Sequence, residues 1–190
     1  MPDNPILLAH RLLAPRIAYL IGTKDAAGTA NLIPVSNLTS VSTSPQQVAL
    51  AVFKDWTTYA NLLAADGFTV TMPTIEQLGS VWKLGARYSR YPAADPTEKL
   101  AACGLTLDHE ASAYGPVVPT GIGWLSCRVV GRLDLGGDHG ITIGEVEQVW
   151  FNPDYLTAEG KPKTMTHPLM QQTGNLFTTT SEMMRSVDYF

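Results

Sequence analysis

A dense run of hydroxyl and amide side chains lies early in the chain, in the segment Val35-Ser-Asn-Leu-Thr-Ser-Val-Ser42. Short hydroxyl and amide groups, with the backbone N–H groups between them, can hydrogen-bond to the rim of a planar heteroaromatic ring or to a phosphate. The same residue types also bond to their own backbone in ordinary turns. Composition alone favours the ordinary turn.

A lysine and two threonines mark the predicted start of a helix in the segment Lys54-Asp-Trp-Thr-Thr-Tyr-Ala-Asn61. Asp55 or Thr57 is expected to cap this helix. A helix N-terminus beside a cation suits a phosphate, because its backbone N–H groups and its dipole both favour an anion. A capped helix start without any ligand explains the same residues, so this segment alone does not establish a site.

His139 lies in a third polar segment, Gly136-Gly-Asp-His-Gly140, which is predicted to form the tip of a β-hairpin. Beside Asp138, His139 could relay a proton or contact a ligand, because imidazole titrates near neutral pH. A turn rich in glycine and aspartate needs no function to explain it. The histidines are scattered without the spacing typical of metal ligands. No metal site is therefore predicted, although a site assembled only by the fold stays open.

Common catalytic motifs are absent from the sequence. It has no Gly-x-Gly-x-x-Gly after a strand, no Walker A loop and no Gly-x-Ser-x-Gly elbow. The two cysteines, Cys103 and Cys127, cannot build a disulfide framework or a cysteine-rich zinc site, and Cys127 is expected to be an inert core thiol. The tryptophans are expected in the core or at a subunit interface rather than stacked on a ligand.

The elements that must position these segments are mostly strands. Turn residues separate the apolar runs, which cover residues 16–23, 30–35, 47–53, 68–72, 124–135 and 141–151. The run 47–53 is so continuous that it predicts burial on both faces, whereas 68–72 alternates. Helical patterns cover residues 57–63, 75–84 and 98–103, the last with Asp95 as cap and Gly104 as stop. After residue 157 only a short helix near 181–185 is predicted.

The order of these elements predicts a mainly β protein with short helices, an antiparallel barrel with the helices packed outside. The chain has 190 residues, 45% of them hydrophobic and 16% charged, which fits one folded domain. A formal net charge of −4 argues against a general binder of nucleic acid or anionic membranes. No apolar run reaches the roughly 20 residues of a membrane helix, and no signal peptide is apparent. We therefore expect a cytoplasmic protein.

Five stretches, taken in order, resemble the flavin reductase-like family, whose fold is an FMN-binding split barrel of the flavoredoxin type. They are Thr29–Ser36 with Ser40–Ser42, Thr57–Leu62, Gly67–Phe68, Glu98–Lys99 with Gly104–Leu105, and Leu125–Cys127 with Gly137–His139 and Ile143–Val146. The resemblance implies one domain over residues 1–190, with a core over about 16–150 and a C-terminal extension over 151–190. In two places the chain departs from the family: only Pro45 stands where a proline pair is common, and no asparagine lies near Thr71.

The resemblance also implies a bound flavin, FMN or alternatively FAD, with NADH or NADPH as co-substrate. By similarity, the ring and part of the ribityl phosphate contact Val35, Ser36, Asn37, Leu38, Thr39, Ser40 and Ser42. The phosphate is expected near Lys54, Thr57 and Thr58, with Arg87 and Arg90 in reserve. His139 is assigned nicotinamide placement or proton delivery. Members of the family are homodimers that hold the flavin near the subunit interface.

The implied activity is NAD(P)H-dependent reduction of flavin, with electrons passed on to free flavin, oxygen or a partner such as a monooxygenase. A flavin-binding electron carrier without its own NAD(P)H turnover is the alternative. A protein like pyridoxamine-phosphate oxidase shares the barrel architecture, but its basic phosphate-site pattern is poorly matched here. A structural domain without flavin is the remaining interpretation.

Overall fold

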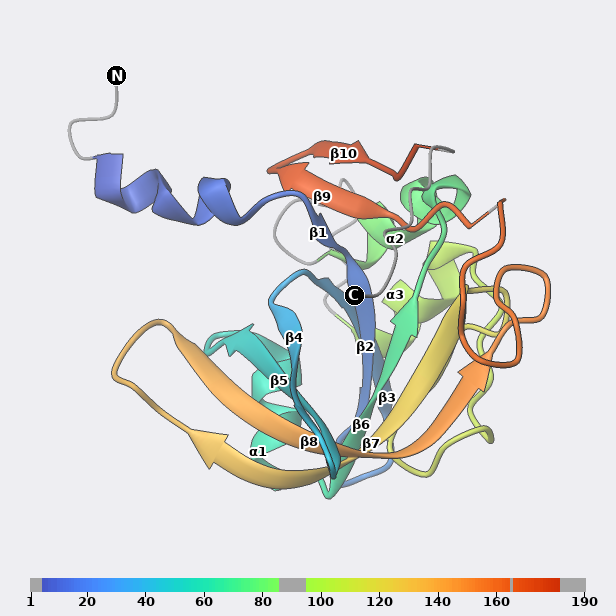
Figure 1. Ribbon diagram of the computed structural model, residues 1–190. Coiled ribbons are helices and arrows are strands. Elements are labelled where there is room, and N and C mark those ends of the chain that lie inside the picture. Colours follow the sequence, from blue (N-terminus) through green and yellow to red (C-terminus); the bar gives the residue numbers. More distant parts are fainter. Residues whose placement is uncertain (1–4, 86–94, 165, 182–190) are drawn as a thin grey trace.

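Strands dominate the computed structural model, which describes residues 5–85, 95–164 and 166–181 (Figure 1). The larger sheet is antiparallel and consists of β2 (Tyr19–Lys24), β3 (Ala30–Val35), β4 (Leu38–Thr43), β5 (Gln46–Phe53), β6 (Gly67–Met72), β7 (Gly123–Leu133) and β8 (His139–Phe151). Its strand order is β3-β2-β6-β7-β8-β5-β4. A smaller sheet has the order β1-β9-β10 and consists of β1 (Arg16–Ile17), β9 (Met170–Thr173) and β10 (Leu176–Thr178).

The two edge strands of the larger sheet, β3 and β4, follow each other in the sequence and are joined by Ser36 and Asn37 alone. In the described part of the chain, β3 is paired with β2 and β4 with β5, and the two edges are not paired with each other. The sheet curls on itself and stays open between these edges. This confirms the predicted antiparallel split barrel.

Short helices accompany the barrel: η1 (Pro5–Leu13), α1 (Thr57–Ala64), η2 (Ile75–Gln77), α2 (Leu78–Leu84) and α3 (Pro96–Cys103). The predicted ends of α3 are confirmed, because the Asp95 carboxylate accepts from the backbone N–H of Thr97 at 2.6 Å and Gly104 stops the helix with φ 80°. The predicted cap of α1 is wrong. A turn follows β5, in which the N–H of Trp56 donates to the carbonyl of Phe53 at 3.1 Å. Trp56 therefore occupies the cap position, and no side chain caps the helix.

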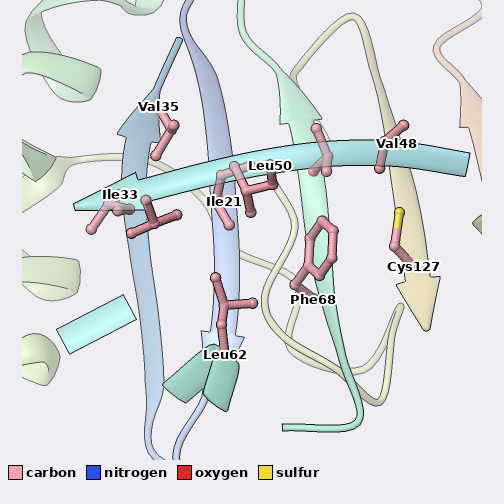
Figure 2. Packing of buried hydrophobic residues seen from close by; sticks show 10 residues of the cluster. Ile21, Ile33, Val35, Val48, Leu50, Leu62, Phe68 and Cys127 are labelled. Carbon is pink, nitrogen blue, oxygen red and sulfur yellow. The ribbon is translucent and has the colours of Figure 1, made fainter. Parts of the chain in front are cut away.

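Two hydrophobic clusters lie on opposite sides of β2 and β3. Figure 2 shows the cluster inside the barrel, where Ile21 and Ile33 pack with Leu50, Leu62, Phe68 and Cys127. The neighbouring residues in each strand, Leu20 and Leu32, belong to the second cluster, with side chains of α2 and α3. Side chains alternate along a strand, so one hairpin forms the wall between both clusters.

Two strands differ from their predicted burial. In β5 the side chains of Val48, Leu50 and Val52 are buried while those between them are partly exposed, so the expected burial on both faces is wrong. In β6 both faces are buried, so the expected alternation is wrong, and the hydroxyl of Thr69 donates to the carbonyl of Pro116 at 2.6 Å. A connecting segment thus covers the outer face of β6, whereas β5 lies next to the open edge of the sheet.

The predicted first strand is divided at Ala18, whose N–H donates to the carbonyl of Leu169 at 2.9 Å. Residues before Ala18 therefore pair with β9 in the small sheet, and those after it pair with β3 and β6 in the barrel. The sequence did not predict β9 and β10. Of the helix predicted near 181–185, all but residue 181 lies outside the described residues, as do Arg87 and Arg90. No helix among the described residues is long and apolar enough to cross a membrane.

Candidate functional site

A pocket of about 210 Å³ lies where β3 ends and the chain turns toward β4. Strands β1, β3, β5 and β8 contribute to its lining, together with α2 and the two C-terminal strands β9 and β10. Its surface is mainly apolar, and none of the described residues that line it is an aspartate or a glutamate. The pocket therefore combines apolar walls with a few polar groups, as small-molecule sites do.

One corner of the pocket is polar and is built from three separate segments. The guanidinium of Arg16 on β1 donates to the amide oxygen of Asn37 at 2.7 Å. Beside it, the hydroxyl of Ser36 donates to the amide oxygen of Gln171 on β9 at 3.1 Å. The turn between β3 and β4 is thus tied to the small sheet by side-chain hydrogen bonds on both of its residues.

Aromatic rings form another part of the pocket lining. Trp82 of α2 and Phe177 of β10 meet edge to face, with ring centroids 5.9 Å apart, and Trp56 also lines the pocket. Trp56 also packs against the barrel core, as expected, and the sequence did not predict that Trp56 and Trp82 line a pocket. Trp124 and Trp150 lie away from this pocket and stack on each other, with centroids 6.4 Å apart, on the paired strands β7 and β8.

His139 lines the pocket at the start of β8. Its Nδ1 lies 2.7 Å from a carboxylate oxygen of Asp138, and its ring packs edge-on against Phe53 at 5.6 Å. This hydrogen bond lowers the pKa of Asp138, which keeps that carboxylate charged. Because Nδ1 is engaged, Nε2 is the ring nitrogen left for a ligand.

The structure brings only some of the sequence-predicted site residues to this pocket. Val35, Ser36, Asn37 and His139 line it. The remaining predicted residues do not, and they are Leu38, Thr39, Ser40, Ser42, Lys54, Thr57 and Thr58. The residues of β4 lie along the open edge of the sheet, and those of its middle are exposed.

Of the residues expected to hold a phosphate, Lys54 and Thr58 bond to other side chains, and Thr57 is exposed. The ammonium of Lys54 lies 2.7 Å from a carboxylate oxygen of Asp134. Thr57 is exposed at the start of α1, whereas Thr58 is completely buried. The first turn of α1 lacks a side-chain cap, so its backbone N–H groups remain suited to an anion.

A buried cation behind Thr58 was not assigned any role from the sequence. Lys99 of α3 donates to the amide oxygen of Asn31 at 2.7 Å, and the amide N–H of Asn31 donates to the Thr58 hydroxyl at 2.8 Å. Burial lowers the pKa of Lys99 to about 8. Both Asn31 and Lys99 lie in stretches that carry the family resemblance, which was the only sequence signal for this network.

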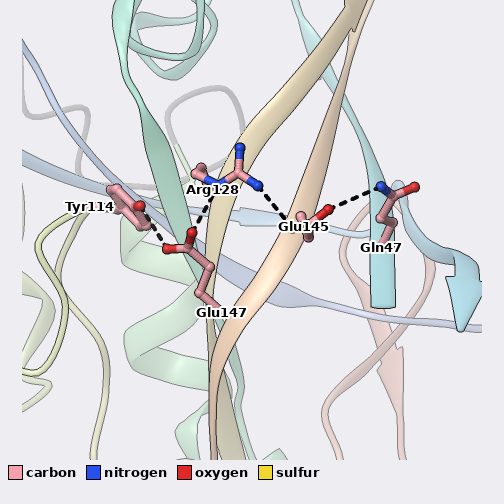
Figure 3. Close-up of polar contacts among 5 residues, drawn as sticks. All are labelled: Gln47, Tyr114, Arg128, Glu145 and Glu147. Atoms are coloured by element: carbon pink, nitrogen blue, oxygen red, sulfur yellow. Dashed lines mark hydrogen bonds and ion pairs between the residues drawn. The ribbon is translucent and has the colours of Figure 1, made fainter. Parts of the chain in front are cut away.

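A second charged network crosses the outside of the barrel, away from the pocket (Figure 3). Arg128 donates from Nε to Glu147 at 2.9 Å and from Nη2 to Glu145 at 2.8 Å. The second carboxylate oxygen of Glu147 accepts from the hydroxyl of Tyr114, and that of Glu145 accepts from the amide of Gln47. Every charge in this network has a partner. The network therefore links neighbouring strands and contributes modestly to stability, as exposed ion pairs do.

The remaining reactive groups offer little chemistry. The described residues hold no cluster of three or more histidine, cysteine, aspartate or glutamate side chains that could bind a metal ion. Both cysteines are buried and unpaired. Burial raises the pKa of Cys127 to about 12, so its thiol stays protonated at neutral pH.

Three solved structures illustrate the fold that this chain shares. The FMN-binding protein of Thermus thermophilus, solved with 1-cyclohex-2-enone, has a TM-score of 0.77 and 18% identity, over 92% of this chain and 91% of its own. Flavoredoxin of Desulfovibrio vulgaris has a TM-score of 0.76 and 20% identity, over 90% of each chain. The NADH:FAD oxidoreductase of Streptomyces globisporus, solved with NAD and FAD fragments, has a TM-score of 0.70 and 19% identity, over 93% of each chain.

At these identities the likeness to solved structures establishes the fold alone. The sequence itself goes further, because residues 11–180 match the family model of the flavin reductase like domain. That match includes β1 with Arg16 at one end and the small-sheet strands with Gln171 at the other. The chain therefore belongs to the flavin reductase like domain family.

Proposed function

We propose that this protein is an FMN-binding oxidoreductase that takes a hydride from NADH or NADPH and passes the electrons to an acceptor. The observation that carries the proposal is the pocket at the open edge of the barrel. There, aromatic walls meet a corner rich in hydrogen-bond donors and free of carboxylates among the described lining residues. A planar heterocycle with hydrogen-bond acceptors along one edge and an anionic tail matches these walls.

The residues present fit a flavin. Trp82 and Phe177 offer apolar surface for the ring, and Val35, Ser36 and Asn37 border it from the end of β3. Along the adjoining edge, backbone groups of Leu38, Thr39, Ser40 and Ser42 on β4 complete the proposed ring contacts.

The phosphate is proposed at the uncapped start of α1, with Lys54, Thr57 and Thr58. Thr58 would contribute its backbone N–H, because its side chain is buried. Lys54 would share its charge between the phosphate and Asp134, whose carboxylate holds it at 2.7 Å. The structural likeness to the NADH:FAD oxidoreductase, which was solved with FAD fragments, supports FAD as the alternative ligand.

A bound flavin supplies the capacity to accept a hydride, and the protein supplies its position and its electrostatic surroundings. His139, oriented by Asp138, is proposed to place the nicotinamide or to deliver a proton from Nε2. Hydride transfer itself needs no general acid. The described lining residues include no carboxylate, which avoids repulsion of the anionic groups on either cofactor.

A flavin-binding electron carrier without its own NAD(P)H turnover is the second candidate. The likeness to flavoredoxin supports it, whereas the likeness to the NADH:FAD oxidoreductase supports the reductase. Both candidates use the same pocket and differ only in whether a nicotinamide reaches the ring.

A homodimer is part of the proposal, and the N-terminal segment supports it. Figure 1 shows η1 reaching away from the barrel, and Ile6, Leu7, Leu12 and Leu13 in it are 65–89% exposed. So much exposed apolar surface is typical of a segment that packs on another protein. Light scattering during gel filtration measures the molar mass in solution, which distinguishes a monomer from a homodimer.

Anaerobic mixing with NADH or NADPH tests the function. The purified protein is loaded with FMN, freed of excess flavin and followed at the flavin absorption maximum, with free FMN as control. Bleaching faster than in the control supports the reductase. A flavin that stays bound and oxidised supports the carrier, and a protein that binds neither FMN nor FAD contradicts both.

A further inference from the structure

Arg16 is a cation in the pocket without an anionic partner. It lines the pocket and is half-buried, and no ion pair joins it to a carboxylate in the described part of the chain. The described cations Lys54 and Lys99 do not line the pocket, and each has a partner elsewhere: Lys54 pairs with Asp134, and Lys99 donates to Asn31. Arg16 therefore provides the permanent positive charge of the described pocket lining.

The hydrogen bond between Arg16 and Asn37 fixes the direction in which the N–H groups of both side chains point. A guanidinium can only donate, so the amide oxygen of Asn37 must face it, and the amide NH₂ of Asn37 is directed elsewhere. The backbone carbonyl of Asn37 is also engaged, by the N–H of Ala51 at 2.9 Å. The corner thus presents the unused N–H groups of Arg16 and Asn37 and lacks a free acceptor on Asn37.

Pairing with the small sheet fixes the backbone of β1 that carries Arg16. Arg16 is directly opposite Gln171 in the register of β1 and β9, and the N–H of Ala18 donates to the carbonyl of Leu169 at 2.9 Å. Gln171 in turn accepts from Ser36, the neighbour of Asn37. A charge fixed in this way stabilises a developing anion without the cost of reorganisation.

We propose that Arg16, oriented by Asn37, faces the pyrimidine edge of the bound flavin and stabilises the negative charge that the ring gains on reduction. The inference rests on the proposed function, because it requires a flavin in this pocket. A reduced flavin carries its charge on the pyrimidine side, and a planar guanidinium matches the neighbouring nitrogen and oxygen of that edge. The phosphate is assigned to the start of α1, which leaves Arg16 for the ring.

The experiment compares the wild type with Arg16→Gln and measures three quantities: the affinities for oxidised riboflavin and for oxidised FMN, and the midpoint potential of bound FMN. Arg16→Gln should bind both oxidised flavins within about threefold of the wild type. It should bind the reduced form about tenfold more weakly, which lowers the two-electron midpoint potential by about 30 mV. Arg16→Lys should restore about half of that shift.

Two further variants separate this role from general effects. Lys24→Gln removes one positive charge from the far end of β2, outside the pocket lining, and should leave the potential unchanged. Asn37→Ala keeps the charge of Arg16 but removes its orienting acceptor, so it should lower the potential by a smaller amount. Asn37→Ala also serves as the test if Arg16→Gln does not fold.

The possible results are distinct. An unchanged midpoint potential in Arg16→Gln overturns the inference and leaves the proposed function intact. Weaker binding of FMN with riboflavin unaffected also overturns it, because Arg16 would then bind the phosphate. Equal losses for both oxidised flavins, without a change in potential, indicate a structural role and contradict the inference as well. A wild-type protein that binds no flavin contradicts the proposed function and the inference together.

Discussion

The ammonium of Lys99 lies 2.7 Å from the amide oxygen of Asn31, so that a buried cation joins α3 to the edge strand β3. The amide N–H of Asn31 donates to the hydroxyl of Thr58 at 2.8 Å, so α1 belongs to the same network. No carboxylate is paired with Lys99 in the described part of the chain. A buried charge without an opposite charge costs stability. Lys99 should therefore leave a signature in the pH dependence of folding.

The stability of the protein should rise between pH 8 and pH 10.5 because of Lys99. Its pKa is lowered from 10.5 to about 8 in the folded state, so within this window the unfolded chain holds a proton that the folded protein has released. The free energy of unfolding then increases with pH, by up to about 3 kcal/mol for this shift. Urea unfolding at a series of pH values measures it.

Lys99→Met is the control for that experiment, because other groups also titrate at high pH. The difference in unfolding free energy between wild type and Lys99→Met should grow in favour of the wild type across the window. A constant difference would show that Lys99 keeps an ordinary pKa in the folded protein.

Gly144 is predicted to be indispensable for barrel packing. A Cβ atom at this position in β8 would lie 2.6 Å from the ring of Phe68, which is completely buried. Gly144→Ala should therefore destabilise the fold by about 1–3 kcal/mol through overpacking. Gly137→Ala, in the turn before β8 where nothing lies within 4 Å, should change stability by less than about 0.5 kcal/mol. Thermal or urea unfolding compares them, and equal effects would contradict the packing argument.

Lys54 is predicted to recognise the phosphate of FMN rather than its ring. Lys54→Ala should weaken FMN binding about tenfold while riboflavin binding changes little, because riboflavin lacks the phosphate. Asp134→Asn provides the matched test, since it releases Lys54 from its ion pair at 2.7 Å. That variant should bind FMN as tightly as the wild type or more tightly. Fluorescence titration measures both ligands, and parallel losses for FMN and riboflavin would exclude this assignment.

His139 is predicted to act on the nicotinamide and not on flavin binding. His139→Asn should raise the KM for NADH or NADPH about tenfold, which corresponds to about 1.4 kcal/mol, while the affinity for FMN stays within about twofold. His109→Asn, at an exposed position outside the pocket, should change neither. Steady-state kinetics and flavin titration check the pair. A loss of flavin affinity in His139→Asn would argue for a role in cofactor binding instead.

Elements with strong local signals could be predicted from the sequence. The β2–β3 and β7–β8 hairpins follow from apolar runs around turn residues, and the ends of α3 follow from Asp95 and Gly104. The small sheet had no such signal. The segment Met170–Thr178 is largely polar, and its strands are defined by pairing with β1 rather than by their own pattern.

The pocket was only partly predictable for the same reason. Val35, Ser36 and Asn37 lie in one polar segment, and His139 stands out at a hairpin tip, so local composition draws attention to them. Arg16 is a single charged residue before an apolar run. Its place in the pocket depends on a pairing with Gln171 that no local pattern specifies.

The hydrogen bond between Ser36 and Gln171 spans 135 positions of sequence. During synthesis on the ribosome, the turn after β3 must therefore wait for most of the barrel to emerge before the opposite side of the pocket exists. Capture of the proposed flavin would accordingly be a late event in the life of each new molecule. A bound flavin would then report that both distant parts of the polypeptide have come together.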